Sequence, residues 1–111
     1  MRILGFSEKW PKLKQPIFTT FRFARKDKDW AVNEEVQIVY KPRSKEREVM
    51  GRARIINRHN NRFLFQVGVT TAEAIADGFE SIEEMGKWLD KTYGHRWLDE
   101  PMNKLTLRWI E

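Results

Sequence analysis

Residues 17–30 read IFTTFRFARKDKDW, a strand pattern that runs into a basic loop. Side chains of a strand alternate between its two faces, so Phe21 and Phe23 share one face while Thr20 and Arg22 share the other. The first face is apolar enough to belong to a core, and the second offers a hydroxyl and a guanidinium side by side. The segment predicts a half-buried strand that either supplies a site or simply ends in a solvated charged turn.

Further strand patterns lie on both sides of this segment. Each alternates apolar and polar residues or follows a turn signal, and they cover residues 2–6, 35–41, 47–57, 62–67 and 104–110. In the fourth strand along the chain, Val49, Gly51, Ala53 and Ile55 are expected to face inward, and the small Gly51 indicates close packing or a bulge. Residues 59–61 (HNN) are expected to form a turn. Such short connections favour an antiparallel sheet or a barrel.

The period of the pattern changes after residue 69. Thr70 and Glu73 have capping-box spacing ahead of a short helix that ends at Gly78. Ser81 and Glu84 repeat that spacing, and a stripe at helical spacing then predicts a second helix packed on the core, with Ile82, Met85, Leu89 and Tyr93 on its apolar side. Strands, two helices and a returning strand predict one α+β domain over residues 1–111: a small β-barrel of about five to six mostly antiparallel strands with two helices packed at its side.

Composition excludes several classes of function. With 111 residues the chain has the size of one domain, and it contains no cysteine, so disulfides, zinc ribbons and thiolate chemistry are excluded. Two isolated histidines, His59 and His95, make a metal site improbable, and no cofactor is expected. No apolar run approaches the ~20 residues that cross a bilayer, so we expect no membrane partner, a cytoplasmic location and, by default, a monomer.

Positive charge is concentrated in the first part of the chain. Residues 1–62 hold 16 Lys or Arg against 7 acids, whereas residues 63–111 hold 5 against 9. A basic region interspersed with aromatic residues is typical of a surface that binds a polyanion, nucleic acid first. The second helix is expected to present an acidic outer face through Glu83, Glu84 and Asp90. The alternative is that the high charge content reflects thermal adaptation.

Taken together, these segments resemble the ASCH domain, a branch of the PUA-like superfamily of small β-barrels. The similarity covers most of the chain: residues 3–6 (ILGF), residues 18–22 (FTTFR) where the family has a Lys-Thr-x-Thr-x-Arg strand, residues 32–36 (VNEEV) where a Gly-Asp turn is usual, and residues 74–81 (AIADGFES) leading to Trp88 and Tyr93. The resemblance implies an RNA or nucleotide ligand in a cleft between barrel and helices.

The resemblance also bears on catalysis. Some family members act as amidohydrolases on acetylated cytidine or as ribonucleases, with a lysine, a threonine and a glutamate. Here Thr20 and Arg22 match the threonine and arginine positions, the glutamate position falls near Asp77, and the lysine position is Ile17. Isoleucine can neither activate a hydroxyl nor carry charge, and a threonine without a base is a poor nucleophile. The sequence therefore favours a binding module over an enzyme.

Three groups of residues are candidates for function. Thr20 and Arg22 are suited to a phosphate or carboxylate, because arginine presents a planar fork of donors; the alternative is a structural pairing of Arg22 with Asp77 or Glu80. Two basic loops are suited to a nucleic-acid backbone, with an aromatic side chain for base stacking, or are solvated turns; their residues are Arg25, Lys26, Lys28, Trp30, Lys41, Arg43, Lys45 and Arg47.

The third group is Asp77 with Glu80, a weaker candidate for a general acid and base. Three hypotheses follow: an RNA- or nucleotide-binding module, a small amidohydrolase or ribonuclease using Thr20, Arg22 and Asp77, and a scaffold for protein interaction. If Phe21 and Phe23 fill the barrel, Arg22 is expected on the side that the helices cover.

Overall fold

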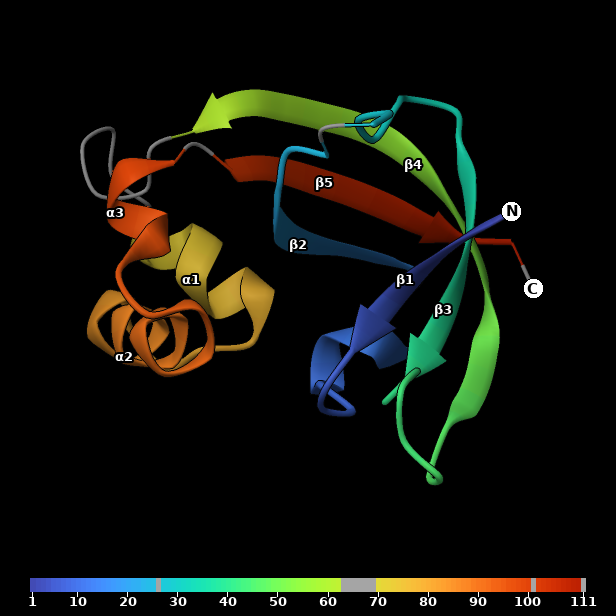
Figure 1. Cartoon of the computed structure of the whole chain (residues 1–111), viewed down its shortest axis with the longest axis horizontal. Helices are drawn as coiled ribbons and strands as arrows, with labels where there is room; N and C mark the ends of the chain where they lie inside the picture. The colour runs from blue at the N-terminus through green and yellow to red at the C-terminus, as the bar shows by residue number, and fades with distance from the viewer. Residues whose placement is uncertain (26, 63–69, 101, 111) are drawn as a thin grey trace.

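Five strands form one curled sheet in the order β1-β3-β4-β5-β2 (Figure 1). The computed structural model describes residues 1–25, 27–62, 70–100 and 102–110. The strands are β1 (Arg2–Phe6), β2 (Ile17–Phe23), β3 (Glu35–Tyr40), β4 (Glu48–Arg62) and β5 (Met102–Trp109). β1 runs parallel to β3 and the other neighbours are antiparallel. Since β1 and β2 are the two sheet edges, the predicted barrel is a half-barrel.

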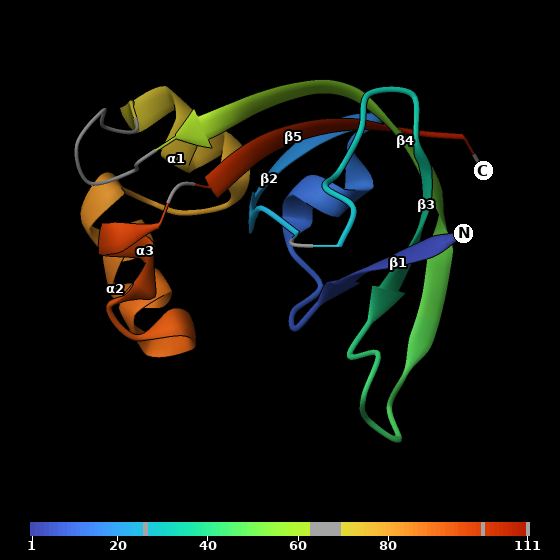
Figure 2. The same ribbon diagram turned by 45° about the horizontal axis from the view of Figure 1, so that its top comes forward.

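The helices gather at one end of this half-barrel, away from the two chain termini (Figures 1 and 2). The two predicted helices are present as α1 (Thr71–Asp77) and α2 (Ile82–Tyr93); a 3-10 helix η1 (Pro11–Lys14) and a short helix α3 (Arg96–Asp99) were not predicted. Thr70 and Glu73 form the predicted capping box, and Ser81 accepts from the backbone of Glu84. In the described part of the chain, no helix has the length and apolar character to cross a membrane.

Two apolar clusters hold the elements together, one on each face of β2. Inside the half-barrel, Phe18 packs with β1, β3, β4 and β5 residues; between sheet and helices, Phe21 packs with Ala74, Met85, Leu89 and Met102. Phe21 and Phe23 therefore do not fill the barrel, and Arg22, which was expected on the helix-covered side if they did, lies on the opposite face of β2. Alternation separates the two faces of a strand correctly, but here helices cover the face that looks more apolar, and the sheet curls around the other.

A bulge in β4 confirms the expectation raised by Gly51. Ile38 pairs with Gly51 while Val39 pairs with Val49, which leaves Met50 as the extra residue. The bulge shifts the alternation by one position, so Val49 is 52% exposed and Met50 packs against the core instead. The inward placement of Val49 was therefore wrong, whereas Ala53 and Ile55 are buried as predicted.

The turn expected at residues 59–61 is absent, because β4 continues to Arg62. His59 pairs with Lys104 of β5, and this cross-strand pairing overrides the local turn preference of the asparagines. The strand predicted at residues 62–67 lies, after Arg62, outside the described residues.

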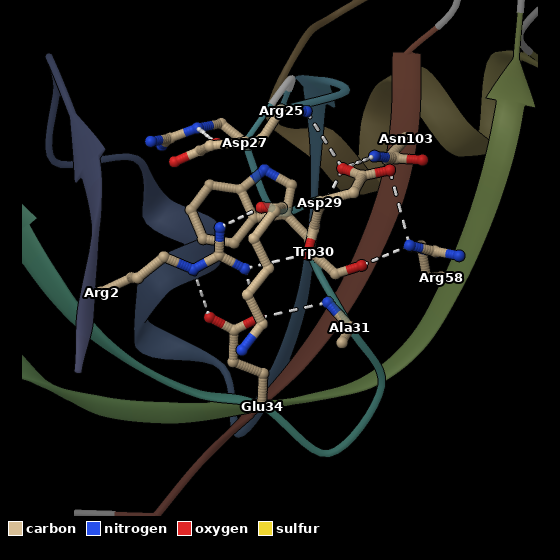
Figure 3. Close-up of polar contacts among 10 residues, drawn as sticks. Arg2, Arg25, Asp27, Asp29, Trp30, Ala31, Glu34, Arg58 and Asn103 are labelled. Atoms are coloured by element: carbon tan, nitrogen blue, oxygen red, sulfur yellow. Dashed lines mark hydrogen bonds and ion pairs between the residues drawn. The ribbon is translucent and has the colours of Figure 1, made fainter.

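Arg2 ties the connection between β2 and β3 to the first strand (Figure 3). Its Nε and Nη2 donate to the two carboxylate oxygens of Glu34, both at 2.6 Å, and its guanidinium lies 4.4 Å from the centroid of the Trp30 ring. Asp29 accepts from Asn103 Nδ2 of β5 at 2.8 Å and from the backbone N–H of Arg25 at 3.2 Å. These bonds position Arg25 at the open side of the half-barrel.

Candidate functional site

A cavity of about 180 Å³ lies where the open end of the half-barrel meets η1 and the helices. Gly5 and Phe6 of β1, Thr20 and Arg22 of β2, and Lys12 of η1 form one side. The opposite side comes from the end of α1 and from α2, through Asp77, Phe79, Met85, Trp88, Leu89 and Tyr93. The site therefore exists only where segments from both ends of the chain meet.

Aromatic rings form much of the wall. Trp10 packs on Phe79 with 5.2 Å between ring centroids and on Trp88 with 5.9 Å, and Trp88 packs on Tyr93 with 6.0 Å. These edge-on arrangements are favourable for aromatic pairs, so the rings of the wall stabilise one another. Planar ring systems are the ligands that such surfaces accommodate best.

The polar end of the cavity contains a buried ion pair. Lys12 Nζ lies 2.9 Å from Asp77 Oδ1, and the two side chains are only 7% and 8% exposed. Burial lowers the pKa of Lys12, against the raising effect of Asp77. Burial likewise raises the pKa of Asp77, against the lowering effect of Lys12. Lys12 is thus the ion-pair partner of the Asp77 carboxylate.

Arg22 lines the same cavity without a carboxylate partner. Its Nε donates to Thr20 Oγ1 at 3.2 Å, and its guanidinium lies 4.6 Å from the centroid of the Phe6 ring. Among the described residues no acid forms an ion pair with it. Burial lowers the pKa of Arg22, which Tyr93 and Asp77 partly oppose. The cavity is therefore lined by two cationic side chains, Lys12 and Arg22, and one anionic side chain, Asp77.

The structure brings together Thr20, Arg22 and Asp77, three of the residues singled out from sequence. The expected pairing of Arg22 with Asp77 is not formed, because Lys12 occupies that carboxylate. Glu80 lines a separate open hollow between Trp10 and α2 rather than the cavity, so it does not converge with Asp77. Ile17 is 45% exposed and does not line the cavity.

The basic loops are partly gathered. Arg25, Arg43 and Arg47 line one groove together with Arg22, and Lys41 lines an adjoining groove while pairing with Glu46 at 3.0 Å. Lys28 and Lys45 are exposed and line neither groove, and Lys26 lies outside the described residues. Glu83, Glu84 and Asp90 of α2 are exposed, as predicted.

Trp30 is placed differently from its sequence interpretation. It is 3% exposed and belongs to the half-barrel core, with Arg2 and Arg25 over its ring. It therefore offers no free face for stacking. Trp10, Phe79, Trp88 and Tyr93, in contrast, line the cavity.

Lys12 is the main residue that sequence reasoning missed. It lies in a short basic stretch between two strands, and only the Trp-Pro step at residues 10–11, which starts η1, distinguishes it. No local pattern points from Lys12 to a carboxylate 65 residues away.

Metal binding has no support in this part of the molecule. Within residues 1–25, 27–62, 70–100 and 102–110, no three His, Cys, Asp or Glu side chains gather as metal ligands would.

Comparison with models of protein families, with curated proteins and with solved structures finds no match for this chain.

Proposed function

We propose that the protein binds a nucleotide, free or as part of RNA, with the base in the aromatic-walled cavity and the phosphate on Arg22. The observation that carries the proposal is the half-buried side chain of Arg22. It lines a cavity whose wall is rich in aromatic rings, and it has no carboxylate partner among the described residues. A charge removed from water needs a counter-charge, because its desolvation otherwise costs several kcal/mol. A ligand that is aromatic at one end and anionic at the other satisfies both halves of the site.

The size of the cavity narrows the ligand. An apolar cavity of roughly 150 Å³ engineered in another protein binds benzene. The volume of about 180 Å³ here is room for one six-membered ring with small substituents. We therefore expect pyrimidine nucleotides to bind better than purine nucleotides, since a second fused ring has to displace part of the aromatic wall.

The first prediction concerns Arg22. Arg22→Ala is expected to weaken binding of UMP or CMP about 10- to 100-fold, because a hydrogen bond to a charged group contributes ~1.5–3 kcal/mol. Binding of the uncharged nucleosides is expected to change little. Isothermal titration calorimetry with both ligands measures the difference, and Arg108→Ala, an exposed arginine of β5, is the matched control.

Two results would contradict this assignment. If Arg22→Ala lowers the unfolding free energy but leaves nucleotide affinity unchanged, the arginine is a structural strut. If nucleotides do not bind at all, the proposed function is wrong and the hypothesis of a protein-interaction scaffold gains weight. The salt dependence of the affinity separates nucleotide binding from the scaffold hypothesis. Phosphate contacts release counterions, so the affinity for a nucleotide falls steeply as the salt concentration rises.

A second candidate function is hydrolysis of an amide on a bound nucleoside, which the arrangement of Lys12, Thr20 and Asp77 around one cavity favours. Against it, the hydrogen bond to Thr20 Oγ1 comes from Arg22, which has no acceptor for the hydroxyl proton. Release of acetate from acetylated cytidine, lost in Thr20→Val, tests this activity. Binding without turnover would leave the first proposal standing alone.

A further inference from the structure

Two grooves adjoin the cavity and share part of its lining. One groove is lined by Gly5, Arg22, Lys41 and Arg43 among others, and the second by Gly5, Arg22, Arg25, Arg43 and Arg47. Gly5 and Arg22 line all three hollows. A ligand anchored at Arg22 can therefore extend out of the cavity along either groove.

The second groove is strongly positive. Four of its lining residues are arginines and none is acidic. Among the described residues, Arg25 forms an ion pair with the exposed Asp27 at 3.5 Å, and Arg47 donates to the backbone carbonyl of Pro42 at 3.4 Å. Arginines that meet in one groove with so few carboxylates repel one another, and an anionic chain relieves that repulsion.

An edge strand forms the floor of this groove. β1 is an edge strand that pairs with β3, so within the described sheet the backbone groups on its other side have no strand partner. Gly5 lets the connection between β3 and β4 approach closely, since a Cβ there would lie 2.7 Å from Pro42 Cγ. This close packing places Arg43 beside the mouth of the cavity.

We propose that the cavity and the arginine groove form one continuous site for single-stranded nucleic acid. One pyrimidine enters the cavity with its phosphate on Arg22, and the neighbouring phosphates follow Arg25, Arg43 and Arg47. This inference rests on the proposed function of the cavity. A duplex is expected to bind more weakly, because its bases are stacked and paired and one of them has to be extruded before it can enter the ring-lined cavity.

The test compares ligands of increasing length. Fluorescence anisotropy with labelled mono-, di-, tetra- and octauridylate is expected to show at least about a tenfold gain between one and four nucleotides. The slope of log affinity against log salt is expected to steepen by about 0.7 for each further phosphate contacted. In the double variant Arg43→Ala, Arg47→Ala, the ratio of tetra- to mononucleotide affinity is expected to fall toward one.

Two controls distinguish an effect of the groove arginines from a general effect of positive charge. Arg43 and Arg47 are exposed, so the double variant is expected to keep the wild-type melting temperature. Arg108 follows the buried Leu107 on β5 and faces away from the interior, so Arg108→Ala is expected to leave the length ratio unchanged. Oligodeoxyuridylate of equal length, which lacks the 2′-hydroxyl but keeps the same base, shows whether that hydroxyl contributes.

Three outcomes would overturn the inference. Mononucleotide binding without a gain in length would remove the continuous site and leave the proposed function intact. Equal binding by a duplex of the same length would show that no base enters the cavity. Equal competition by poly-glutamate would reduce the groove to a nonspecific polyanion surface. Failure of every mononucleotide to bind would instead overturn the proposed function itself.

Discussion

Asp77→Ala is expected to lower the free energy of unfolding by about 3–5 kcal/mol at neutral pH, because it leaves the buried Lys12 ammonium without a partner. The two side chains are 7% and 8% exposed and lie 2.9 Å apart, so little solvent replaces the lost carboxylate. Chemical denaturation monitored by tryptophan fluorescence measures the loss.

The loss is expected to shrink as the pH rises from 7 toward 10. Burial already lowers the pKa of Lys12, and in the variant the carboxylate that raises this pKa is gone. When a lysine has a lower pKa in the folded than in the unfolded state, the protein becomes more stable as the pH rises from the folded pKa to the unfolded pKa. It loses that stability again as the pH falls back to the folded pKa. Deprotonation of Lys12 is therefore expected to raise the unfolding free energy of the variant between the folded pKa of Lys12 and its ordinary pKa of 10.5.

A double variant is the control for this interpretation. Lys12→Met with Asp77→Leu replaces both charges by apolar groups of similar size, and its stability is expected to be close to or above that of the wild type. If Asp77→Ala costs less than about 1 kcal/mol with no pH dependence, the pair is solvated and the cavity is more open than the structure indicates.

Leu89→Ala is expected to cost about 2–5 kcal/mol of unfolding free energy, as a cavity-forming substitution. Leu89 is 3% exposed and, with Met85 of the same helix, packs in one cluster with Phe21, Ala74 and Met102. Because these contacts dock the helices on β2, the same variant is expected to loosen the aromatic wall and weaken nucleotide binding. Urea unfolding and calorimetry on one preparation measure both effects.

Ile82→Ala is the matched control, because it removes an apolar side chain from the same helix where the side chain is 44% exposed. Its effect is expected to stay within about 0.5 kcal/mol, as for most surface substitutions. A loss below about 1 kcal/mol for Leu89→Ala would mean that α2 packs loosely on the sheet.

Local patterns were sufficient to predict most of the elements. Alternation identified β2 and β3, the cap residues Thr70 and Ser81 identified the starts of both helices, and Gly51 indicated the bulge. Each of these signals acts over a few residues, because strand alternation, capping hydrogen bonds and backbone freedom are properties of neighbouring positions. The α+β class followed from their order along the chain.

Tertiary structure alone decided what covers each face and which charges meet. Both faces of β2 are covered, so its composition did not reveal that Phe18 is inside the half-barrel and Phe21 under the helices. Arg22 lines the cavity, but Asp77, one of the two partners considered for it, pairs instead with Lys12, which is 65 residues away in the sequence. The amino-acid sequence by itself determined the elements and the excess of positive charge. The chain's long-range packing determined the site, since burial and charge pairing depend on residues that are distant in sequence.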